Sequence, residues 1–276
     1  MRRKHLLPAF RWMQALTAAI FCAALPLAAG AQTAAPKIGV VVMHGKGGTP
    51  ARHVSELADH LERKGYLVAN PEMPWSGRRN YDVPVAAAEQ ELEAALEVLR
   101  SKGAQKLFVA GHSFGGLFAL YFAGRHAIDG VIAMAPGGDV GNRIYREKLG
   151  ESVELARQFV AGQKGNEPAR LSDYEGSRGI YPIVTIPAAY LSWFEPDGAM
   201  NQTRMTQALK PQTPVLYISP RNDYPGLLTV KQRMFNALPA NALNRLYEPD
   251  ASHLGAPSAA RDEIVRWTTE VAGAGN

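Results

Sequence analysis

The sequence predicts an α/β fold: a mostly parallel sheet of about six core strands flanked by helices, with a cap inserted between the fourth and fifth core strands. Three observations lead to this prediction. Short apolar segments alternate with longer amphipathic ones, as in parallel sheets that helices cover on both faces. The 276-residue chain is long enough for one domain with a well-buried core. One interval between two expected strands, residues 137–212, is too long for a simple crossover.

Six segments are expected to form the strands. Each is short, and turn-forming or charged residues border it. Some, such as IGVVVM at residues 38–43, contain only apolar residues and suit the interior of a sheet covered on both sides. The expected strands are residues 38–43, 66–70, 106–110, 130–135, 214–219 and 244–248.

Amphipathic segments between these strands predict the helices. The first covers residues 49–65, with Thr49 as its expected N-cap and Pro50 at its first helical position. Within the 137–212 interval we expect a helix near residues 147–161 and a turn-rich remainder, which together form a cap or lid over the site. The other expected helices are residues 85–103, the segment after Ser113, residues 228–238 and residues 258–271.

The first thirty-one residues have the layout of a secretory signal peptide. A basic segment is followed by a long apolar run and by AGA at residues 29–31, which predicts cleavage after Ala31. An uncleaved anchor helix is the alternative, but the apolar run is short for a bilayer and Pro26 interrupts it. We therefore expect residues 32–276 to form a periplasmic or secreted domain without a stable membrane anchor.

The leader also carries most of the excess charge and the only cysteine. The whole chain has 30 basic and 25 acidic residues, a net charge of +5. Residues 1–31 hold four of the basic residues and no acid, so the mature chain has a net charge of about +1 and gives no support for nucleic-acid binding. Because Cys22 lies in the leader, the mature chain has no thiolate nucleophile, thiolate metal ligand or disulfide.

The segment GHSFG at residues 111–115 has the form G-x-S-x-G and lies between an expected strand and an expected helix. Gly111 and Gly115 leave room for a sharp turn that holds Ser113 in a strained backbone conformation. Such a turn raises the serine oxygen to the carboxyl edge of the sheet. Ser113 is therefore the expected nucleophile, with a plain glycine-rich turn as the alternative.

A serine nucleophile needs a base, and the base needs an acid to orient it. His253, in the loop after the last strand, is the expected base because it can reach back over the sheet edge. His44, at the end of the first strand, is the alternative. Asp223, which follows the next-to-last strand, is the expected acid. Asp250 and Asp139, which follows the expected strand at residues 130–135, are the alternative acids, although a turn residue beside Pro249 is the simpler interpretation of Asp250.

Acyl transfer also needs donors for the developing oxyanion. Glycines at positions 45, 47 and 48 allow the loop after the first strand to turn its backbone toward the serine. The expected donors are the backbone N–H groups of Lys46 and Phe114. The Lys46 side chain is expected to be a solvated surface charge.

These motifs together resemble the α/β-hydrolase superfamily, whose order is nucleophile, acid, histidine. The resemblance covers nearly all of residues 38–271 and implies an α/β-hydrolase fold. Two departures leave the substrate open: the family's two leading strands have no counterpart, and the 137–212 interval matches no subfamily motif. The motifs are HGKGG at 44–48, GHSFGG at 111–116, RNDYPG at 221–226 and DASHLG at 250–255.

The resemblance implies a serine hydrolase that cleaves carboxylic esters through an acyl-enzyme, with Ser113, Asp223 and His253 as its catalytic triad. It assigns the oxyanion hole to the N–H groups of Lys46 and Phe114. A peptidase or amidase with the same triad is one alternative, and a non-catalytic binding protein of this fold is another.

No cofactor or metal is expected, since the sequence has no H-E-x-x-H run, no His/Cys cluster and no phosphate-binding fingerprint. The expected partner is a small-molecule ester, and the oligomeric state is left open. Six bulky or charged residues either line the substrate pocket or pack the cap onto the core: Trp75, Arg78, Arg79, Tyr190, Trp193 and Phe194.

Overall fold

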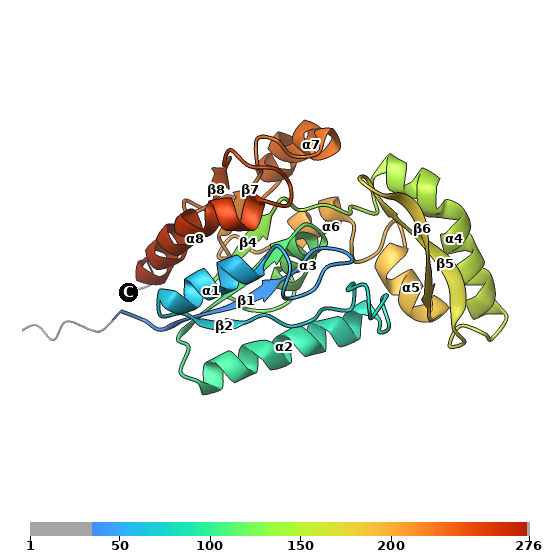
Figure 1. The fold of residues 1–276 in the computed structure, drawn as a ribbon, viewed down its shortest axis with the longest axis horizontal. Coiled ribbons are helices and arrows are strands. Elements are labelled where there is room, and N and C mark those ends of the chain that lie inside the picture. Colours follow the sequence, from blue (N-terminus) through green and yellow to red (C-terminus); the bar gives the residue numbers. More distant parts are fainter. Residues whose placement is uncertain (1–34, 275–276) are drawn as a thin grey trace, which may run out of the picture. The chain divides into compact units, whose positions relative to one another are not determined.

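A six-stranded parallel sheet forms the centre of the protein, as the sequence predicts (Figure 1). The computed structural model describes residues 35–274, so the predicted signal peptide lies outside the described residues. The strand order is β2-β1-β3-β4-β7-β8, and each neighbouring pair is parallel. The strands are β1 (Ile38–Met43), β2 (Leu67–Ala69), β3 (Lys106–His112), β4 (Gly130–Met134), β7 (Val215–Ile218) and β8 (Arg245–Tyr247).

Alternate residues of the strands face opposite sides of the sheet and enter two apolar clusters. Val40 and Val42 pack toward α1 and α8 on one face, whereas Val41 and Met43 pack toward α2 and α3 on the other. Helix cover on both faces explains why these strands are apolar throughout. The helices outside the cap are α1 (Ser55–Arg63), α2 (Val85–Ser101), α3 (Phe114–Ala123), α6 (Gln202–Ala208), α7 (Pro225–Asn236) and α8 (Ala256–Gly273).

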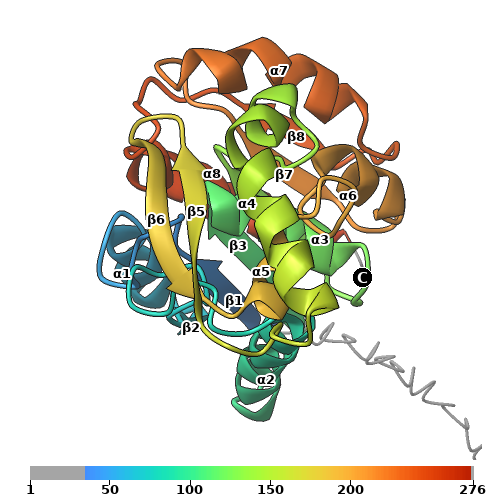
Figure 2. The same ribbon diagram turned by 90° about the vertical axis from the view of Figure 1, so that its right-hand side faces the viewer.

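Residues 143–194, here called the cap, are inserted between β4 and β7. β5 and β6 form a separate antiparallel pair, and Figure 2 shows this hairpin beside α4. In Figure 1 the cap elements gather beyond the ends toward which the arrow of β1 points, so the cap lies at the carboxyl edge of the sheet. Its elements are α4 (Arg143–Ala161), β5 (Ala169–Glu175), β6 (Gly179–Thr185) and α5 (Pro187–Phe194).

The inserted interval is more regular than the sequence predicts. α4 confirms the helix expected near residues 147–161, but the remainder contains the β5–β6 hairpin and two helices instead of mainly turns. α6, although it lies within this interval, packs against α3 of the core. The hairpin is hard to predict because β6 contains Pro182, a residue rare inside strands. The proline is tolerated because, within residues 35–274, β6 pairs with β5 alone and so has one edge without a partner strand.

The first helix begins later than predicted. Thr49 and Pro50 lie in turns, and α1 starts at Ser55. His53 has a φ of +60°, a left-handed conformation that an α-helix cannot contain. The helix therefore starts only after this residue, and the predicted N-cap is wrong.

Among the helices of residues 35–274, none combines the length and the apolar character that crossing a bilayer requires.

The turn between β3 and α3 is packed too tightly for side chains on its glycines. A Cβ at Gly111 would lie 2.0 Å from the carbonyl oxygen of Gly115, and one at Gly115 would lie 2.6 Å from that of His44. Backbone atoms cannot move away as a flexible side chain can. These contacts fix how closely β1, β3 and α3 approach one another.

We expect Gly111→Ala to lower the free energy of unfolding by at least about 3 kcal/mol, because its Cβ overlaps backbone. Gly150→Ala is the matched control, since Gly150 is exposed on α4 and a Cβ there meets no atom within 4 Å. That change should stabilise the protein by about 0.5–1 kcal/mol through helix propensity. Urea denaturation measures both, and similar small effects for the two variants would contradict the crowding at the turn.

Candidate active site

The candidate site lies where the strand order reverses, between β1 and β3. Loops that leave adjacent strands in opposite directions open a crevice at the carboxyl edge of such a sheet. A cavity of about 320 Å³ lies there, and Ser113, His253, Lys46 and Phe114 are among its lining residues. The structure therefore brings these four sequence-predicted residues to one cavity, and it places the fifth, Asp223, directly behind His253.

Ser113 occupies the corner between β3 and α3 in a strained backbone conformation, with φ +55° and ψ −117°. The strain is held by the corner's own hydrogen bonds. The Ser113 N–H donates to the carbonyl of Met134 on β4 at 2.8 Å, and the Ser113 carbonyl accepts from Gly116 N–H at 2.9 Å. Backbone strain of this kind is found where a side chain must be presented in one direction.

His253 and Asp223 meet because their loops continue the pairing of β7 and β8. The backbone N–H of Asn222 donates to the Ala251 carbonyl at 3.1 Å, and Asn222 and Ser252 form a parallel bridge. One residue beyond these, Asp223 Oδ1 lies 2.7 Å from His253 Nδ1. Both side chains are buried, so the carboxylate orients the imidazole away from bulk solvent.

The structure distinguishes between Asp223 and Asp250 as partners of His253. Asp223 Oδ1 also accepts from the backbone N–H of Tyr224 at 2.7 Å, which fixes the carboxylate against His253. Asp250 is exposed and accepts from the side chain of Asn222 at 2.9 Å. Asp250 therefore stabilises the turn, as its position beside Pro249 suggests.

His44 is fully buried and both of its ring nitrogens are engaged with backbone. The Met73 N–H donates to Nε2 at 3.0 Å, so the ring proton lies on Nδ1 and is donated to the Gly45 carbonyl at 2.8 Å. Burial lowers the pKa of His44 and keeps it neutral. Its ring shapes the loop after β1 and is not free to accept a proton from Ser113.

His112 connects the serine corner to the loop that carries His253. Its Nε2–H donates to the His253 carbonyl at 2.9 Å, which leaves Nδ1 unprotonated and buried, with no hydrogen-bond partner in the part of the chain that the structure describes. Burial, followed by the nearby positive charge that His253 can carry, lowers the pKa of His112 to about 3. The second residue of the G-x-S-x-G motif thus positions the expected base through its backbone.

Two backbone N–H groups beside Ser113 are free to bind an oxyanion. Phe114 is the first residue of α3, so its N–H has no acceptor within the helix. The Lys46 N–H donates no hydrogen bond within residues 35–274. A Cβ at Gly45 would lie 3.2 Å from the Cβ of Ser113, so the loop that carries Lys46 passes directly beside the serine.

The prediction for the Lys46 side chain is wrong. The side chain is 5% exposed, and its ammonium forms an ion pair with Asp173 on β5 of the cap, with 2.7 Å between Nζ and Oδ1. Lys46 stands among glycines in a loop, a setting that predicts a solvated side chain. The cap, whose structure the sequence does not predict, covers that loop.

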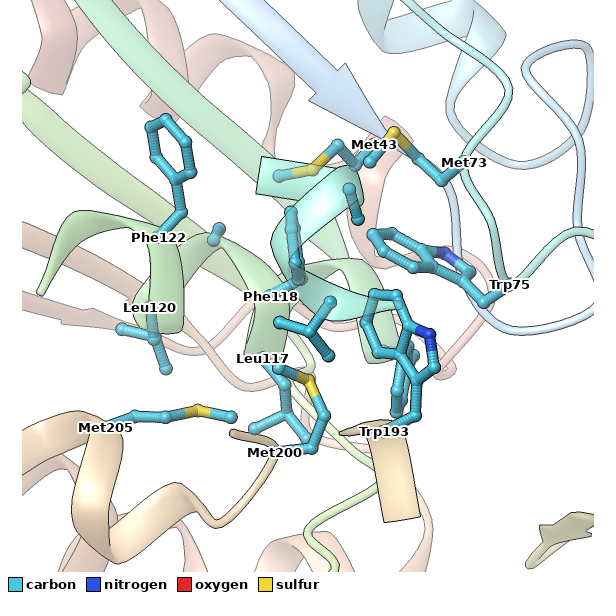
Figure 3. Close-up of a cluster of buried hydrophobic side chains, with 14 of the residues drawn as sticks. Met43, Met73, Trp75, Leu117, Phe118, Leu120, Phe122, Trp193, Met200 and Met205 are labelled. Carbon is cyan, nitrogen blue, oxygen red and sulfur yellow. The ribbon is translucent and has the colours of Figure 1, made fainter. Parts of the chain in front are cut away.

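The aromatic residues singled out in the sequence pack the cap onto the core instead of lining the cavity. Figure 3 shows Trp193 of α5 beside Trp75 and Phe118. The ring centroids of Trp193 lie 5.8 Å from those of Trp75 and 5.7 Å from those of Phe118. Tyr190 and Phe194 are also buried in this cluster. The two arginines, Arg78 and Arg79, pair with acidic residues outside the cavity.

The residues that line the cavity give it one apolar and one polar wall. Leu227, Val230 and Met234 of α7 form the apolar wall. Asp139 and Glu175 contribute carboxylates to the polar wall. The sequence indicates Asp139 only as an alternative acid. The other four residues were not identified, because they lie on a helix face and at the end of β5, which only the fold brings together.

The comparison with protein-family models decides the family. The model for the alpha/beta hydrolase family matches residues 40–267. The chain belongs to the alpha/beta hydrolase family. This α/β hydrolase has no significant match among curated protein sequences.

Solved structures of similar fold cover most of this α/β hydrolase. A structure reported with the metagenome-derived lipolytic enzymes LipS and LipT has 20% identity and a TM-score of 0.59, over 86% of this chain and 95% of that one. The monoacylglycerol lipase of Paleococcus ferrophilus has 21% identity and a TM-score of 0.60, over 84% and 94%. Est1E from Butyrivibrio proteoclasticus, with ferulic acid bound, has 15% identity and a TM-score of 0.56, over 86% and 89%. At these identities the likeness establishes the fold.

Asp173 is the most informative residue that the sequence analysis missed. In β5, Ala169, Leu171 and Asp173 recur at every second position and all three are buried. A charged residue in phase with two apolar ones in a strand was the available signal, since a buried charge requires a partner.

We expect the stability of this α/β hydrolase to fall at mildly acidic pH because of His112. Between pH 6.5 and about 3 the unfolded chain binds a proton at His112 that the folded protein excludes, so stability rises with pH across this window. Lowering the pH from 7.5 to 5.0 should therefore cost about 2 kcal/mol through this residue.

His112→Gln provides the test, because the amide can donate to the His253 carbonyl but does not titrate. Urea denaturation at the two pH values should show a smaller acid-induced loss in the variant than in the parent protein. Equal losses in the two proteins would contradict the role given to His112.

Proposed function

We propose that this α/β hydrolase is a serine esterase that cleaves small carboxylic esters through an acyl-enzyme. The observation that carries the proposal is the presence in one cavity of a strained Ser113 and of His253, whose Nδ1 lies 2.7 Å from Asp223. The fold shared with lipolytic enzymes and with Est1E is consistent with it.

In the proposed reaction Ser113 Oγ attacks the ester carbonyl while His253 Nε2 takes the serine proton. The carbonyl electrons move to oxygen, and when the tetrahedral intermediate collapses the alcohol leaves with the proton from His253. Water then attacks the acyl-enzyme by the same route and releases the acid. Asp223 keeps the Nδ1–H in place and stabilises the imidazolium that forms twice in each cycle.

Among the hydrogen bonds of residues 35–274, His253 Nδ1 contacts Asp223 but none joins the His253 ring to Ser113 Oγ, so the proposed reaction needs this contact to form when substrate binds. Such hydrogen bonds are often long before substrate binds. The N–H groups of Lys46 and Phe114 are the proposed oxyanion donors, because both are free and both lie next to the serine.

The cavity supports a small or medium neutral ester as the substrate. Its volume of about 320 Å³ is at the lower end of the range for small-molecule sites. The apolar wall of α7 suits an aliphatic acyl chain. The carboxylates of Asp139 and Glu175 disfavour an anionic group on the substrate. The Lys46 ammonium cannot offset them, because it is already paired with Asp173.

We also propose export to the periplasm or medium, on the basis of residues 1–31 alone. Their basic, apolar and small-residue segments follow the order of a secretory signal peptide. A mature chain without cysteine suits that destination, since it cannot form incorrect disulfides there.

The proposed nucleophile can be tested with a fluorophosphonate probe and a panel of p-nitrophenyl esters from acetate to palmitate. We expect labelling of the parent protein at Ser113 and highest turnover with the shorter esters. Ser113→Ala should abolish labelling and lower kcat by about 10^6, the cost measured in a well-studied triad.

Matched amide substrates in the same assay distinguish an esterase from a peptidase. Labelling of the Ser113→Ala variant would rule out the assigned nucleophile. A correctly folded parent protein that neither reacts with the probe nor turns over any ester or amide would indicate a non-catalytic binding protein.

The proposed acid can be tested by comparing two aspartates of adjacent loops. Asp223→Asn should lower kcat by up to about 10^4, because the amide holds the imidazole in the wrong tautomer. Asp250→Asn should change kcat less than threefold, since Asp250 contacts only the turn. Steady-state kinetics on the best ester measure both, and the reverse ranking would transfer the acid's role to Asp250.

A further inference from the structure

The side chain of Lys46 runs from the loop beside Ser113 into the cap. Its Nζ donates to Asp173 Oδ1 at 2.7 Å, to the Tyr174 carbonyl at 3.2 Å and to the Tyr145 hydroxyl at 3.4 Å. All three partners belong to the cap. Because the Lys46 side chain is 5% exposed, its ammonium needs such a set of acceptors. Without them, burying the charge would destabilise the folded protein strongly.

Asp173 is held in turn by both the cap and the core. Its Oδ2 accepts from the hydroxyls of Tyr81 and Tyr181, each at 2.9 Å. Its Oδ1 accepts from the Tyr174 N–H at 2.6 Å as well as from Lys46. Tyr81 reaches the carboxylate from a loop of the core, where its φ is +60°. The carboxylate is therefore a junction between the two parts of the molecule.

The Lys46 ammonium also contacts the residue that carries the other proposed oxyanion donor. It lies 5.1 Å from the ring centroid of Phe114, and at 5.2 and 5.4 Å from those of Tyr145 and Phe194. Rings around a buried cation add cation–π attraction to the ion pair. Burial alone would lower the pKa of Lys46, but the charge of Asp173 outweighs it and raises the pKa, so the cation persists at neutral pH.

The backbone atoms of Lys46 make no hydrogen bond themselves, and the loop is held through its neighbouring glycines. Within residues 35–274 its N–H donates no hydrogen bond and its carbonyl accepts none. The flanking residues Gly45, Gly47 and Gly48 give the loop high conformational freedom. The Gly45 carbonyl, in the same peptide group as the Lys46 N–H, accepts from His44 Nδ1 at 2.8 Å and from the Gly48 N–H at 3.1 Å, and these bonds set the direction of the N–H within the loop. The Lys46 side chain is the polar attachment that ties this hydrogen-bonded loop to the cap.

We propose that Lys46 is a positioning residue whose buried ammonium, held by Asp173 of the cap, keeps the loop that carries its own backbone N–H in place beside Ser113, so that this N–H can serve as an oxyanion donor. The proposal rests on the proposed esterase function. Docking of the cap then completes the oxyanion hole, and Asp173 contributes to the reaction through Lys46 without touching substrate.

Lys46→Met and Asp173→Asn test the proposal, with kcat and KM measured on the best p-nitrophenyl ester. Each change should lower kcat at least tenfold and leave KM within about threefold, because the lost contact acts on the transition state. Loss of a whole oxyanion donor costs about 10^2–10^3. Lys46→Arg should restore part of kcat, since it keeps the charge.

A trifluoromethyl ketone that forms a tetrahedral adduct with the serine gives an independent readout. Its inhibition constant should rise in both variants by about the same factor as kcat falls, whereas that of the matching methyl ketone should stay within threefold. A role limited to folding would move neither constant in the molecules that remain folded.

Thr185→Val is the matched control, because Thr185 on β6 donates to the Tyr81 carbonyl at 2.9 Å and so joins cap to core without touching Lys46. It should lower the midpoint of thermal unfolding but leave kcat within threefold. Tyr181→Phe replaces Lys46→Met if that variant fails to fold, and it should lower kcat less than Asp173→Asn does.

An unchanged kcat in folded Lys46→Met and Asp173→Asn would overturn the proposal, as would a rise in KM alone. A fall in kcat in Thr185→Val equal to that in Asp173→Asn would also overturn it, since general loosening of the cap would then explain both. A parent protein that neither turns over esters nor reacts with a fluorophosphonate would refute the esterase function itself, and circular dichroism confirms folding in every case.

Discussion

Close backbone packing at the end of β3 is the constraint on which the rest of the site depends. At Gly111 and Gly115, α3 approaches β3 and β1 so closely that a Cβ atom at either position would overlap backbone atoms. The same approach holds Ser113 at φ +55° and brings the loop after β1 beside it. Ser113, the free N–H of Phe114 and the start of α3 therefore take their positions from one crowded turn.

Around this turn, buried polar side chains mainly position backbone. His44 ties the Met73 and Gly45 segments together, and His112 holds the loop of His253 by its carbonyl. Both histidines have lowered pKa values because burial disfavours their charged forms. Of His44, His112 and His253, only His253 has a carboxylate beside it. Among these three it is therefore the imidazole suited to proton transfer.

The sequence correctly predicts those elements whose conformation depends on residues close to them in the chain. β1 lies at the predicted residues 38–43, and the serine corner follows from its glycines. The predicted start of α1 is wrong because His53 adopts a left-handed conformation, which the neighbouring residues do not indicate. The burial of Lys46 could not be predicted for a different reason: its partner Asp173 is 127 residues away, in a hairpin whose charged and proline residues weaken the strand pattern. Contacts across such separations depend on the cap's docking, which local patterns do not encode.

The attachment of the cap has a kinetic consequence. Its helix α5 inserts Trp193 among core aromatic residues, and its strand β5 supplies the carboxylate that neutralises Lys46. Swinging the cap away would expose an indole and break a buried ion pair before any bond in the substrate changed. In the proposed reaction we therefore expect substrate to enter the cavity while the cap stays docked, so that no opening of the cap precedes the first bond-making step.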